Sequence, residues 1–579
     1  MPTDLAKVAL LYDNDGYVEL LQRRENAPPE AARGLMGRQV AGKEFLDAYL
    51  RFGRWDQLVT LVRNESSRKS IINYFRDHPF AHAPHTLRVI AINKFCAAFH
   101  PADPAAAPAA TTLHFPCPID AHFAWSRHHA GPGAYALTGL THTICTPAVM
   151  RSVCELVEAP FESFDSLICI SRAALQSVKS VADSYAAYLK DRFGGNPHLR
   201  PRLAHIPLGV NPERYRPATP AERLASRQTL NIPADAIVVL FVGRLSYAGK
   251  VHPFPMFQGL NAAALATGKP VHLILSGWAE NDILLQHFKQ GAATFASNIT
   301  TTIVNGTNPA FRYSVWHAAD IFTSLTDNIQ ETLSQVILEG MACGLPVVIT
   351  DWDGCRDQAI DGQHGYLVPA RMVHNATQNL APRHLINELP YGQFLADCNQ
   401  TVSVDLQATT AAFTRLINDP ALRRQMGAAA RQRILENFTW ERTIHAYQAL
   451  WTEQNAVRKS WLAQYAHAAA APRPYFTPAV FPEVEQAYAS YPMTILDAPN
   501  IVQTDRRDLL DALLATPITN YRAEARVADR ALLLSILAAA AAGCSIANLD
   551  ALLAAAKVPP IPARATIAWM LKYSLLKPA

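Results

Sequence analysis

Short apolar runs, each about the length of a strand, alternate with helical stretches in the first part of the chain. Gly42–Gly53 ("GKEFLDAYLRFG") is typical of a helix closed by glycine, and another helix is predicted from about Ala173. Apolar runs of about four to eight residues between turn signals are typical of buried strands. The pattern therefore predicts strands at Lys7–Tyr12, 112–116, 135–144 and Ser166–Ser171.

The same alternation restarts after His205–Pro217 ("HIPLGVNPERYRP"). Five further strands are predicted in this part, at "AIVVLFVGRL", "HLILSG", "TTIVNG", "ADIFTSL" and "PVVITD". Apolar strands separated by helices form parallel sheets that are buried on both faces, and ligands bind at the carboxyl ends of such strands. We therefore predict an α/β protein with two doubly wound, Rossmann-like domains, residues 1–215 and 216–430, that face each other across a cleft.

The rest of the chain is predicted to be mainly helical. The helical pattern runs from Ser403 to about Lys459, and we expect residues 431–466 to pack back on the N-terminal domain. After a Pro/Ala-rich linker at about His467–Pro482, residues 483–579 are rich in Ala and Leu and contain no strand run. These last residues indicate a helical, winged-helix-like accessory domain.

The accessory domain has few basic residues where a DNA-binding version needs them. Along its second helix only Arg564, Lys572 and Lys577 are available. A recognition helix requires basic side chains that face the nucleic acid. We therefore predict no nucleic acid binding and instead homo-oligomerisation or a protein partner through residues 483–579.

Composition and charge narrow the class of protein. The 579 residues are 50% hydrophobic and 17% charged, with a net charge of +4, which gives no case for a nucleic acid or an acidic membrane surface. The nine cysteines form no C-x-x-C pair, as expected of reduced thiols. The N-terminus "MPTDLAKVALLYDNDG" lacks a basic-then-apolar signal pattern, and the most apolar run, Ala531–Ala542, is too short to span a bilayer. We expect a cytoplasmic protein.

Two glutamates in "ETLSQVILEGMACGLPVVITDWDG" are candidate ligand-binding residues. The pattern predicts a helix that begins at Glu331, with Glu339 eight residues further on. Eight residues rise about 12 Å along a helix, so the two carboxylates could hold opposite ends of one elongated ligand. The alternative is that both are solvated surface glutamates.

Four features point to a ligand that carries phosphate. The helix N-terminus at Glu331 offers unpaired N–H groups to an anion. Arg244 and Lys250 follow a strand end in "VGRLSYAGK" and could clamp a diphosphate without a metal. The loop Gly34–Leu46 has three glycines, which permit close approach of backbone to phosphate. His142 lies between two threonines just past a strand, although a lone histidine is more often structural.

Together these residues resemble a known family. Val242–Pro369 resembles the donor-binding domain of a family-4 retaining glycosyltransferase of the GT-B fold. The resemblance is carried by Glu331 and Glu339, by "GMACGLPVV" and by "DWDGCRDQAIDGQHGYLVP", downstream of the Gly-Arg…Lys segment. It extends, more weakly, over roughly residues 1–455, and the final part of the chain lies outside it.

The resemblance implies a role for each matching position. Glu331 is expected to hold hydroxyls of the donor sugar, Glu339 the ribose of the nucleotide, and His142 to lie beside the sugar. Arg244 and Lys250 are expected to stabilise the departing nucleoside diphosphate, since charge develops there as the glycosidic bond breaks. The resemblance also implies transfer with retention of configuration, and we expect neither a cofactor nor a metal. The full set of expected donor-binding residues is Gly37, Arg38, Gly42, Gly243, Arg244, Lys250, Glu331, Thr332, Leu333, Ser334 and Glu339.

The chain also departs from the family pattern. Ser334 replaces a glycine close to the donor, and Gly340 stands where alanine is commoner. The segments 13–15 ("DND") and 351–353 ("DWD") imitate a metal-binding Asp-x-Asp, but we interpret both as turns at strand ends.

Three functions remain open. The leading hypothesis is a glycosyltransferase that uses a nucleotide-diphosphate sugar and an unidentified acceptor (a glycan, a lipid-linked group or a protein). A sugar-nucleotide 2-epimerase of the same fold is the nearest alternative enzyme. A non-catalytic nucleotide-sugar sensor, disabled by the "ETLS" sequence, is the alternative from another class.

Overall fold

The computed structural model of the chain divides into two compact units, Met1–Ala479 and Val480–Ala579. The structure describes residues 7–13, 16–17, 37–78, 86–95, 99, 108–306, 308, 311, 313–468, 479–520 and 528–579. The two units are described separately below.

The first half of Met1–Ala479 is built on a seven-stranded parallel sheet with the strand order β3-β2-β1-β4-β5-β6-β7. The strands are β1 (Val8–Tyr12), β2 (Leu58–Val62), β3 (Leu87–Ala91), β4 (Thr112–His114), β5 (Ala136–Leu140), β6 (Ser166–Cys169) and β7 (Arg202–His205). The connecting helices are α2 (Gly37–Phe52), α3 (Glu65–Asp77), α5 (Ala121–Ala130), α6 (Pro147–Glu158) and α7 (Arg172–Phe193). Every residue of β1 and β5 is buried, as the apolar runs predict.

The second half repeats this architecture. Its seven strands have the order β10-β9-β8-β11-β12-β13-β14, and only β14 is antiparallel to its neighbour. They are β8 (Ile237–Val242), β9 (Val271–Gly277), β10 (Thr300–Asn305), β11 (Ile321–Ser324), β12 (Val347–Asp351), β13 (Gly365–Met372) and β14 (Val402–Val404). Helices α8 (Pro220–Thr229), α9 (Phe254–Thr267), α10 (Asp282–Phe295), α12 (Ser314–Ala318), α13 (Gln335–Ala342), α14 (Cys355–Gln358), α15 (Leu380–Leu385) and α16 (Tyr391–Asn399) connect them.

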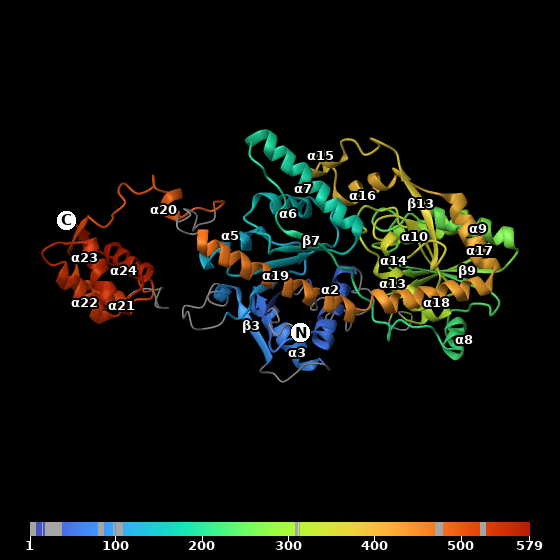
Figure 1. The fold of residues 1–579 in the computed structure, drawn as a ribbon, viewed down its shortest axis with the longest axis horizontal. Coiled ribbons are helices and arrows are strands. Elements are labelled where there is room, and N and C mark those ends of the chain that lie inside the picture. The colour runs from blue at the N-terminus through green and yellow to red at the C-terminus, as the bar shows by residue number, and fades with distance from the viewer. Residues whose placement is uncertain are drawn as a thin grey trace. The chain divides into compact units, whose positions relative to one another are not determined.

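Three helices follow β14: α17 (Leu406–Asn418), α18 (Pro420–Asn437) and α19 (Trp440–Ala468). In Figure 1, α18 lies in the half that contains α13, whereas α19 crosses to the half that contains α2. The crossing is fixed by two buried hydrogen bonds, from Trp440 Nε1 to Glu44 Oε2 (2.8 Å) and from Thr138 Oγ1 to Gln454 Oε1 (2.7 Å). The chain thereby returns to its first half, and the predicted architecture of two Rossmann-like domains in the GT-B arrangement is confirmed.

One predicted boundary is wrong. The helix expected to begin at Glu331 begins at Gln335, and Ser334 is its extended N-cap residue (φ −93°, ψ 106°). The reason is a contact with the other half of the unit, because the Thr332 hydroxyl donates to the His142 carbonyl (2.7 Å). Gln335 also donates from Nε2 to the Gly209 carbonyl (2.7 Å). These bonds hold Thr332 in a turn, so Glu331 and Glu339 do not lie on one helix.

The unit Val480–Ala579 has its own apolar core and is mainly helical, as predicted. Its helices are α20 (Val484–Ala487), α21 (Leu510–Ala515), α22 (Arg530–Ala539), α23 (Ile546–Ala555) and α24 (Pro560–Lys572). The prediction that it lacks strands is wrong. A small antiparallel sheet with the order β16-β15-β17 joins Cys544–Ser545, Ile501–Thr504 and Leu576–Pro578. Strands this short leave no run of apolar residues in the sequence.

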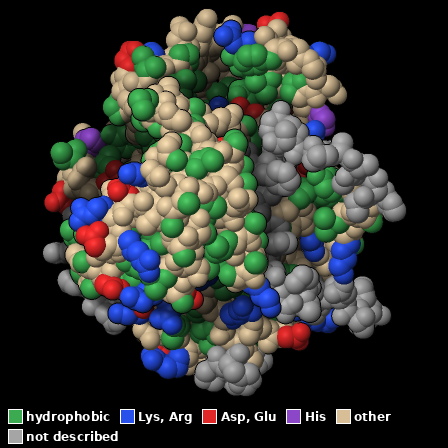
Figure 2. All heavy atoms as spheres, turned by 90° about the vertical axis from the view of Figure 1, so that its left-hand side faces the viewer, with side chains coloured by type: hydrophobic (Ala, Val, Ile, Leu, Met, Phe, Trp, Pro, Cys, Tyr) green, Lys and Arg blue, Asp and Glu red, His purple; other side chains and the backbone are tan. Residues whose placement is uncertain are grey.

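The face of the molecule drawn in Figure 2 is mixed in character. Figure 2 shows hydrophobic side chains scattered among charged ones on the side that it draws. Within the described ranges, none of the helices has both the length and the apolar character that crossing a membrane requires.

Candidate functional site

The site predicted in the second half is assembled at the carboxyl ends of its strands. The loop after β8 carries Gly243, Arg244 and Lys250, and the loop after β11 carries Glu331. Gly243 has a φ of +156°, a conformation that side-chain-bearing residues rarely adopt. The loop after β12 carries Asp353. Ligands of doubly wound sheets bind at this edge.

Both predicted cations are held in place by protein acceptors. Lys250 Nζ forms a close ion pair with the Glu331 carboxylate. Arg244 donates from Nη2 to the Gly249 carbonyl (2.7 Å) and from Nη1 to Glu280 Oε1 (3.1 Å). The structure therefore brings two of the predicted site residues, Lys250 and Glu331, into direct contact.

The loops after β8 and β11 are also tied together by hydrogen bonds between side chains of one loop and the backbone of the other. Asn328 Nδ2 donates to the Ala248 carbonyl (2.6 Å), and Thr326 Oγ1 donates to the Lys250 carbonyl (3.2 Å). Asp327, which is 4% exposed, accepts from the backbone N–H of His252 (3.2 Å). Burial raises the pKa of Asp327 to about 7. Sequence reasoning missed this carboxyl, since nothing in "SLTDNIQ" signals its burial.

The N-terminus of α13 presents an unusual serine. Ser334 is 1% exposed and stands at the N-cap, yet its hydroxyl makes no capping hydrogen bond. Among the described residues, Ser334 Oγ has no hydrogen-bond partner. The first N–H groups of a helix also lack intrahelical acceptors. A buried hydroxyl and free N–H groups at one helix end form a natural binding site for an anion or a sugar hydroxyl.

The other predicted residues of this segment, Thr332, Leu333 and Glu339, lie in different surroundings. Leu333 is 6% exposed and belongs to the apolar core. The Thr332 side chain is engaged with His142. Glu339 lies in the second turn of α13 and is 7% exposed, so the alternative of a solvated surface glutamate is wrong for it.

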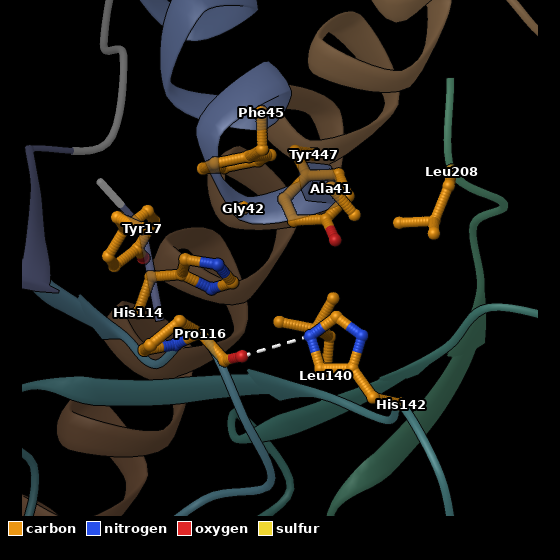
Figure 3. Close-up of a pocket in the computed structure, with 10 residues that line it drawn as sticks. All are labelled: Tyr17, Ala41, Gly42, Phe45, His114, Pro116, Leu140, His142, Leu208 and Tyr447. Atoms are coloured by element: carbon orange, nitrogen blue, oxygen red, sulfur yellow. Dashed lines mark hydrogen bonds between the residues drawn. The ribbon is translucent and has the colours of Figure 1, made fainter. Parts of the chain in front are cut away.

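His142 lies just past β5, as predicted, and faces a small cavity (Figure 3). Its Nε2 donates to the Pro116 carbonyl (3.1 Å). Burial lowers the pKa of His142 to about 4, more strongly than the bond to Pro116 raises it. The imidazole is therefore neutral at physiological pH, with its proton on Nε2 and with Nδ1 as a hydrogen-bond acceptor.

The cavity beside His142 has a volume of about 20 Å³, which is room for about one water molecule. Ten residues line it: Tyr17, Ala41, Gly42, Phe45, His114, Pro116, Leu140, His142, Leu208 and Tyr447. Figure 3 shows the Tyr447 hydroxyl and the His142 imidazole on facing sides of it. Tyr17 OH and His114 Nδ1 are buried there without partners among the described residues.

The predicted glycine loop, Gly34–Leu46, lies only partly within the described residues. Gly34–Met36 lie outside the described residues, and Gly37 begins α2. A Cβ at Gly42 would lie 2.0 Å from the Gly16 carbonyl oxygen, so packing of α2 against this segment requires glycine there. Arg38 lies near enough to His142 for its charge to contribute to the lowered pKa of the imidazole. The loop and His142 therefore share one side of the site.

Of the two Asp-x-Asp segments, only the second lies entirely within the described residues. Asn14 and Asp15 lie outside the described residues. The segment 351–353 is a turn at the end of β12, as predicted. Its Asp353 lies close enough to Glu331 and Lys250 for both charges to affect its pKa, which sequence reasoning did not anticipate.

The structure thus has two α/β domains, and the predicted residues Arg244, Lys250 and Glu331 lie at the carboxyl ends of the strands of the second. Residues 236–381 match the model of the family described as glycosyl transferases group 1. The glycosyltransferase resemblance is confirmed for this segment. Its assignment to family 4 stays a prediction.

Two curated relatives and one solved structure are similar to parts of this chain. Over 288 residues the chain is 26% identical to an alpha-maltose-1-phosphate synthase of Mycobacterium tuberculosis (strain CDC 1551 / Oshkosh). The matched segment covers 48% of this chain and 65% of the relative. The chain is also 26% identical over 290 residues to a D-inositol 3-phosphate glycosyltransferase of Geodermatophilus obscurus, with 48% and 52% covered. The chain therefore spans less than two thirds of the length of these relatives. A sucrose-phosphate synthase from Thermosynechococcus elongatus is a structural match with a TM-score of 0.45 and 17% identity, over 78% of this chain and 99% of that one.

Proposed function

We propose that this protein is a retaining glycosyltransferase that moves a sugar from a nucleotide-diphosphate donor to an acceptor. The observation that carries the proposal is the contact between Lys250 and Glu331 at the N-terminal end of α13, within the segment that matches group 1 glycosyl transferases. A cation, a carboxylate and a helix N-terminus at one strand edge provide complementary groups for a diphosphate and the sugar attached to it.

We propose that each part of the donor binds to a different group of the site. Glu339 binds the ribose, and the N-terminal N–H groups of α13 bind the diphosphate. Lys250 then exchanges Glu331 for phosphate oxygens, which releases the Glu331 carboxylate to accept hydrogen bonds from the sugar. Arg244 adds a second positive charge. Fixed cations stabilise the charge that grows on the leaving diphosphate, and we expect no metal to be required for this.

The first half is proposed to supply the opposite wall of the reaction centre. The Thr332–His142 hydrogen bond sets the end of β5 against the turn that carries Glu331. The neutral His142 can accept a hydrogen bond from a sugar hydroxyl through Nδ1. From the family resemblance we infer transfer with retention of configuration, in which the acceptor approaches on the face that the diphosphate leaves.

The test is incubation of the protein with UDP-glucose, UDP-galactose, UDP-N-acetylglucosamine, GDP-mannose and ADP-glucose in excess chelator. We expect nucleoside diphosphate release from one base class, slow donor hydrolysis without acceptor, and an α-anomeric product from an α-linked donor by NMR. The Lys250→Ala variant is the control for contaminating hydrolases. Release of an inverted product would contradict retention, and binding of nucleoside diphosphate without any turnover would favour the sensor.

A finer proposal concerns location and partners. We propose that the protein acts in the cytoplasm, supported by unpaired thiols at all eight cysteines of the described part. We also propose that Val480–Ala579 binds a protein partner or a second copy of the chain. Arg564 of this unit is ion-paired with Asp550 (2.7 Å), and Arg530 with Asp511 (2.7 Å), so these cations are already neutralised. Sedimentation of the full chain, with and without duplex DNA, tests self-association and the expected lack of DNA binding; fractionation of cells tests the location.

A further inference from the structure

Asp353 stands in a turn that is pressed against the sugar side of the proposed donor site. A Cβ at the next residue, Gly354, would lie 2.2 Å from the Thr332 carbonyl oxygen and 3.2 Å from Leu333 Cα. Trp352 Nε1 donates to the Asn328 carbonyl (3.2 Å), which ties the other side of the turn to the same loop. The turn that holds Asp353 therefore packs directly against the segment that holds Glu331.

The Asp353 carboxyl has one occupied and one unoccupied oxygen. Oδ1 accepts a hydrogen bond from the backbone N–H of Cys355 (3.2 Å). Oδ2 is buried and has no partner among the described residues. A buried polar oxygen without a partner costs free energy, so its retention requires a reason beyond the local turn. The local turn is already satisfied by Oδ1.

The surroundings of Asp353 set its protonation. Burial is the main cause that raises the pKa of Asp353 well above the usual range, and the nearby Glu331 carboxylate raises it further. Lys250 opposes this shift more weakly. A raised pKa favours the protonated carboxyl, which has an O–H to donate, whereas the Glu331 carboxylate that pairs with Lys250 offers only acceptors.

On the basis of the proposed function, we propose that Asp353 is a further substrate-binding residue, whose carboxyl group donates a hydrogen bond to a hydroxyl of the donor sugar beside the hydroxyl held by Glu331. The two carboxyls then form a complementary pair, one donor and one acceptor, that recognises two hydroxyls of the same sugar ring. This pair selects sugars by the position of their hydroxyls. The exchange of Lys250 from Glu331 to the diphosphate strengthens the pair, since it removes the cation that opposes protonation of Asp353.

The backbone at Asp353 allows two well-matched substitutions. Its φ of +38° is tolerated by glycine and asparagine better than by most residues. Asp353→Asn keeps an acceptor for the Cys355 N–H and replaces the O–H with an N–H donor. Asp353→Gly removes both groups without straining the backbone. Asp351→Asn is the control, because Asp351 belongs to the same turn but bonds to Arg356 (2.5 Å) at the surface.

The experiment measures kcat/KM for the fastest donor of the panel above and for its 2-, 3-, 4- and 6-deoxy analogues. We expect Asp353→Gly to lower kcat/KM about tenfold or more, and Asp353→Asn by less than about threefold. One deoxy analogue should abolish the difference between Asp353→Gly and the wild type, because the hydroxyl that Asp353 contacts is then missing. UDP affinity, measured by calorimetry, should be unchanged in all three variants.

Two results would overturn the role of Asp353 and leave the proposed function intact. One is an equal loss for Asp353→Gly with every deoxy analogue, which indicates a structural role. The other is wild-type kcat/KM in Asp353→Gly. If the wild-type protein neither binds UDP, GDP or ADP nor turns over any donor, the proposed function itself fails.

Discussion

The two Rossmann-like halves share one topology but differ in the chemistry at their strand ends. The second half places Lys250, Glu331, the buried Asp327 and the half-buried Asp353 at its edge. The first half places a neutral histidine and a small, mostly apolar cavity there. We propose that Lys250 of the second half stabilises the leaving diphosphate, whereas the neutral groups of the first half shape the space around the sugar. On this proposal, the second half supplies donor affinity and the first half supplies geometry at the reacting carbon.

The largest expected effects separate the two glutamates of the second half. Glu331→Ala should lower turnover about 100-fold and leave UDP affinity within about twofold, because Glu331 is proposed to bind the sugar alone. Glu339→Ala should weaken binding of UDP and of the donor alike, by about tenfold, because the ribose contact persists throughout the reaction. Calorimetry with UDP and initial rates with the donor measure both.

Conservative variants guard against a folding defect. Glu331→Gln and Glu339→Gln preserve size, and circular dichroism should match the wild type. Equal losses of UDP affinity in the Glu331 and Glu339 variants would contradict binding at two ends of the donor.

The next prediction tests the role of the neutral His142 in the first half. His142→Ala should lower turnover about tenfold with UDP affinity unchanged, since it removes one hydrogen-bond acceptor for the sugar. Because burial holds the pKa of His142 near 4, the imidazole does not titrate between pH 6 and 8. The ratio of wild-type to variant kcat/KM should therefore be constant over that range. A ratio that changes with a midpoint near pH 6.5 would assign His142 a charged state.

A smaller effect is expected at Ser334. Its buried hydroxyl has no described protein partner, so we expect it to bind the donor and to contribute on the order of 1 kcal/mol, about fivefold in affinity. Ser334→Gly should weaken binding of the native donor by that factor and relax the choice between sugars. Ser334→Ala, which removes only the hydroxyl, should show the same loss. A sharp rise in turnover for Ser334→Gly would instead mark the serine as an obstruction and favour the sensor hypothesis.

Asp327 should affect stability more than activity. Its pKa is about 7 in the folded chain, above the value of about 3.9 for an unfolded chain. Between these values the folded state binds the extra proton, so stability falls as pH rises, by on the order of 4 kcal/mol in total. Asp327→Asn should raise the thermal midpoint at pH 8 by about 5 °C and at pH 5 by only about 2 °C. Turnover should stay within about twofold; an equal midpoint shift at both pH values would refute the pH linkage.

The sequence predicts the central strands well and the edges poorly. Strands such as β8 are buried on both faces, so their apolar runs are easily recognised. The missed strands β3, β7, β13 and β14 are partly exposed and mix polar with apolar residues. β2 was also missed, although it is fully buried.

The site is predictable only where its groups are local in sequence. Lys250 and Glu331 were found because their motifs are short. The start of α13 was misplaced because Thr332 bonds to His142, which is 190 residues away. The burial that shifts the pKa of Asp327 and Asp353 also depends on distant segments, and no local pattern encodes it.

The central claim is that cations of the second half bind the donor diphosphate in place of a metal. Calorimetric titration of UDP, GDP and ADP into wild-type protein and Lys250→Ala, each with excess EDTA, tests it most directly. We predict that one nucleotide binds the wild type with the same affinity with and without EDTA, and that Lys250→Ala weakens this binding about tenfold or more. Loss of wild-type binding in EDTA, with recovery on addition of Mg²⁺ or Mn²⁺, would contradict the claim.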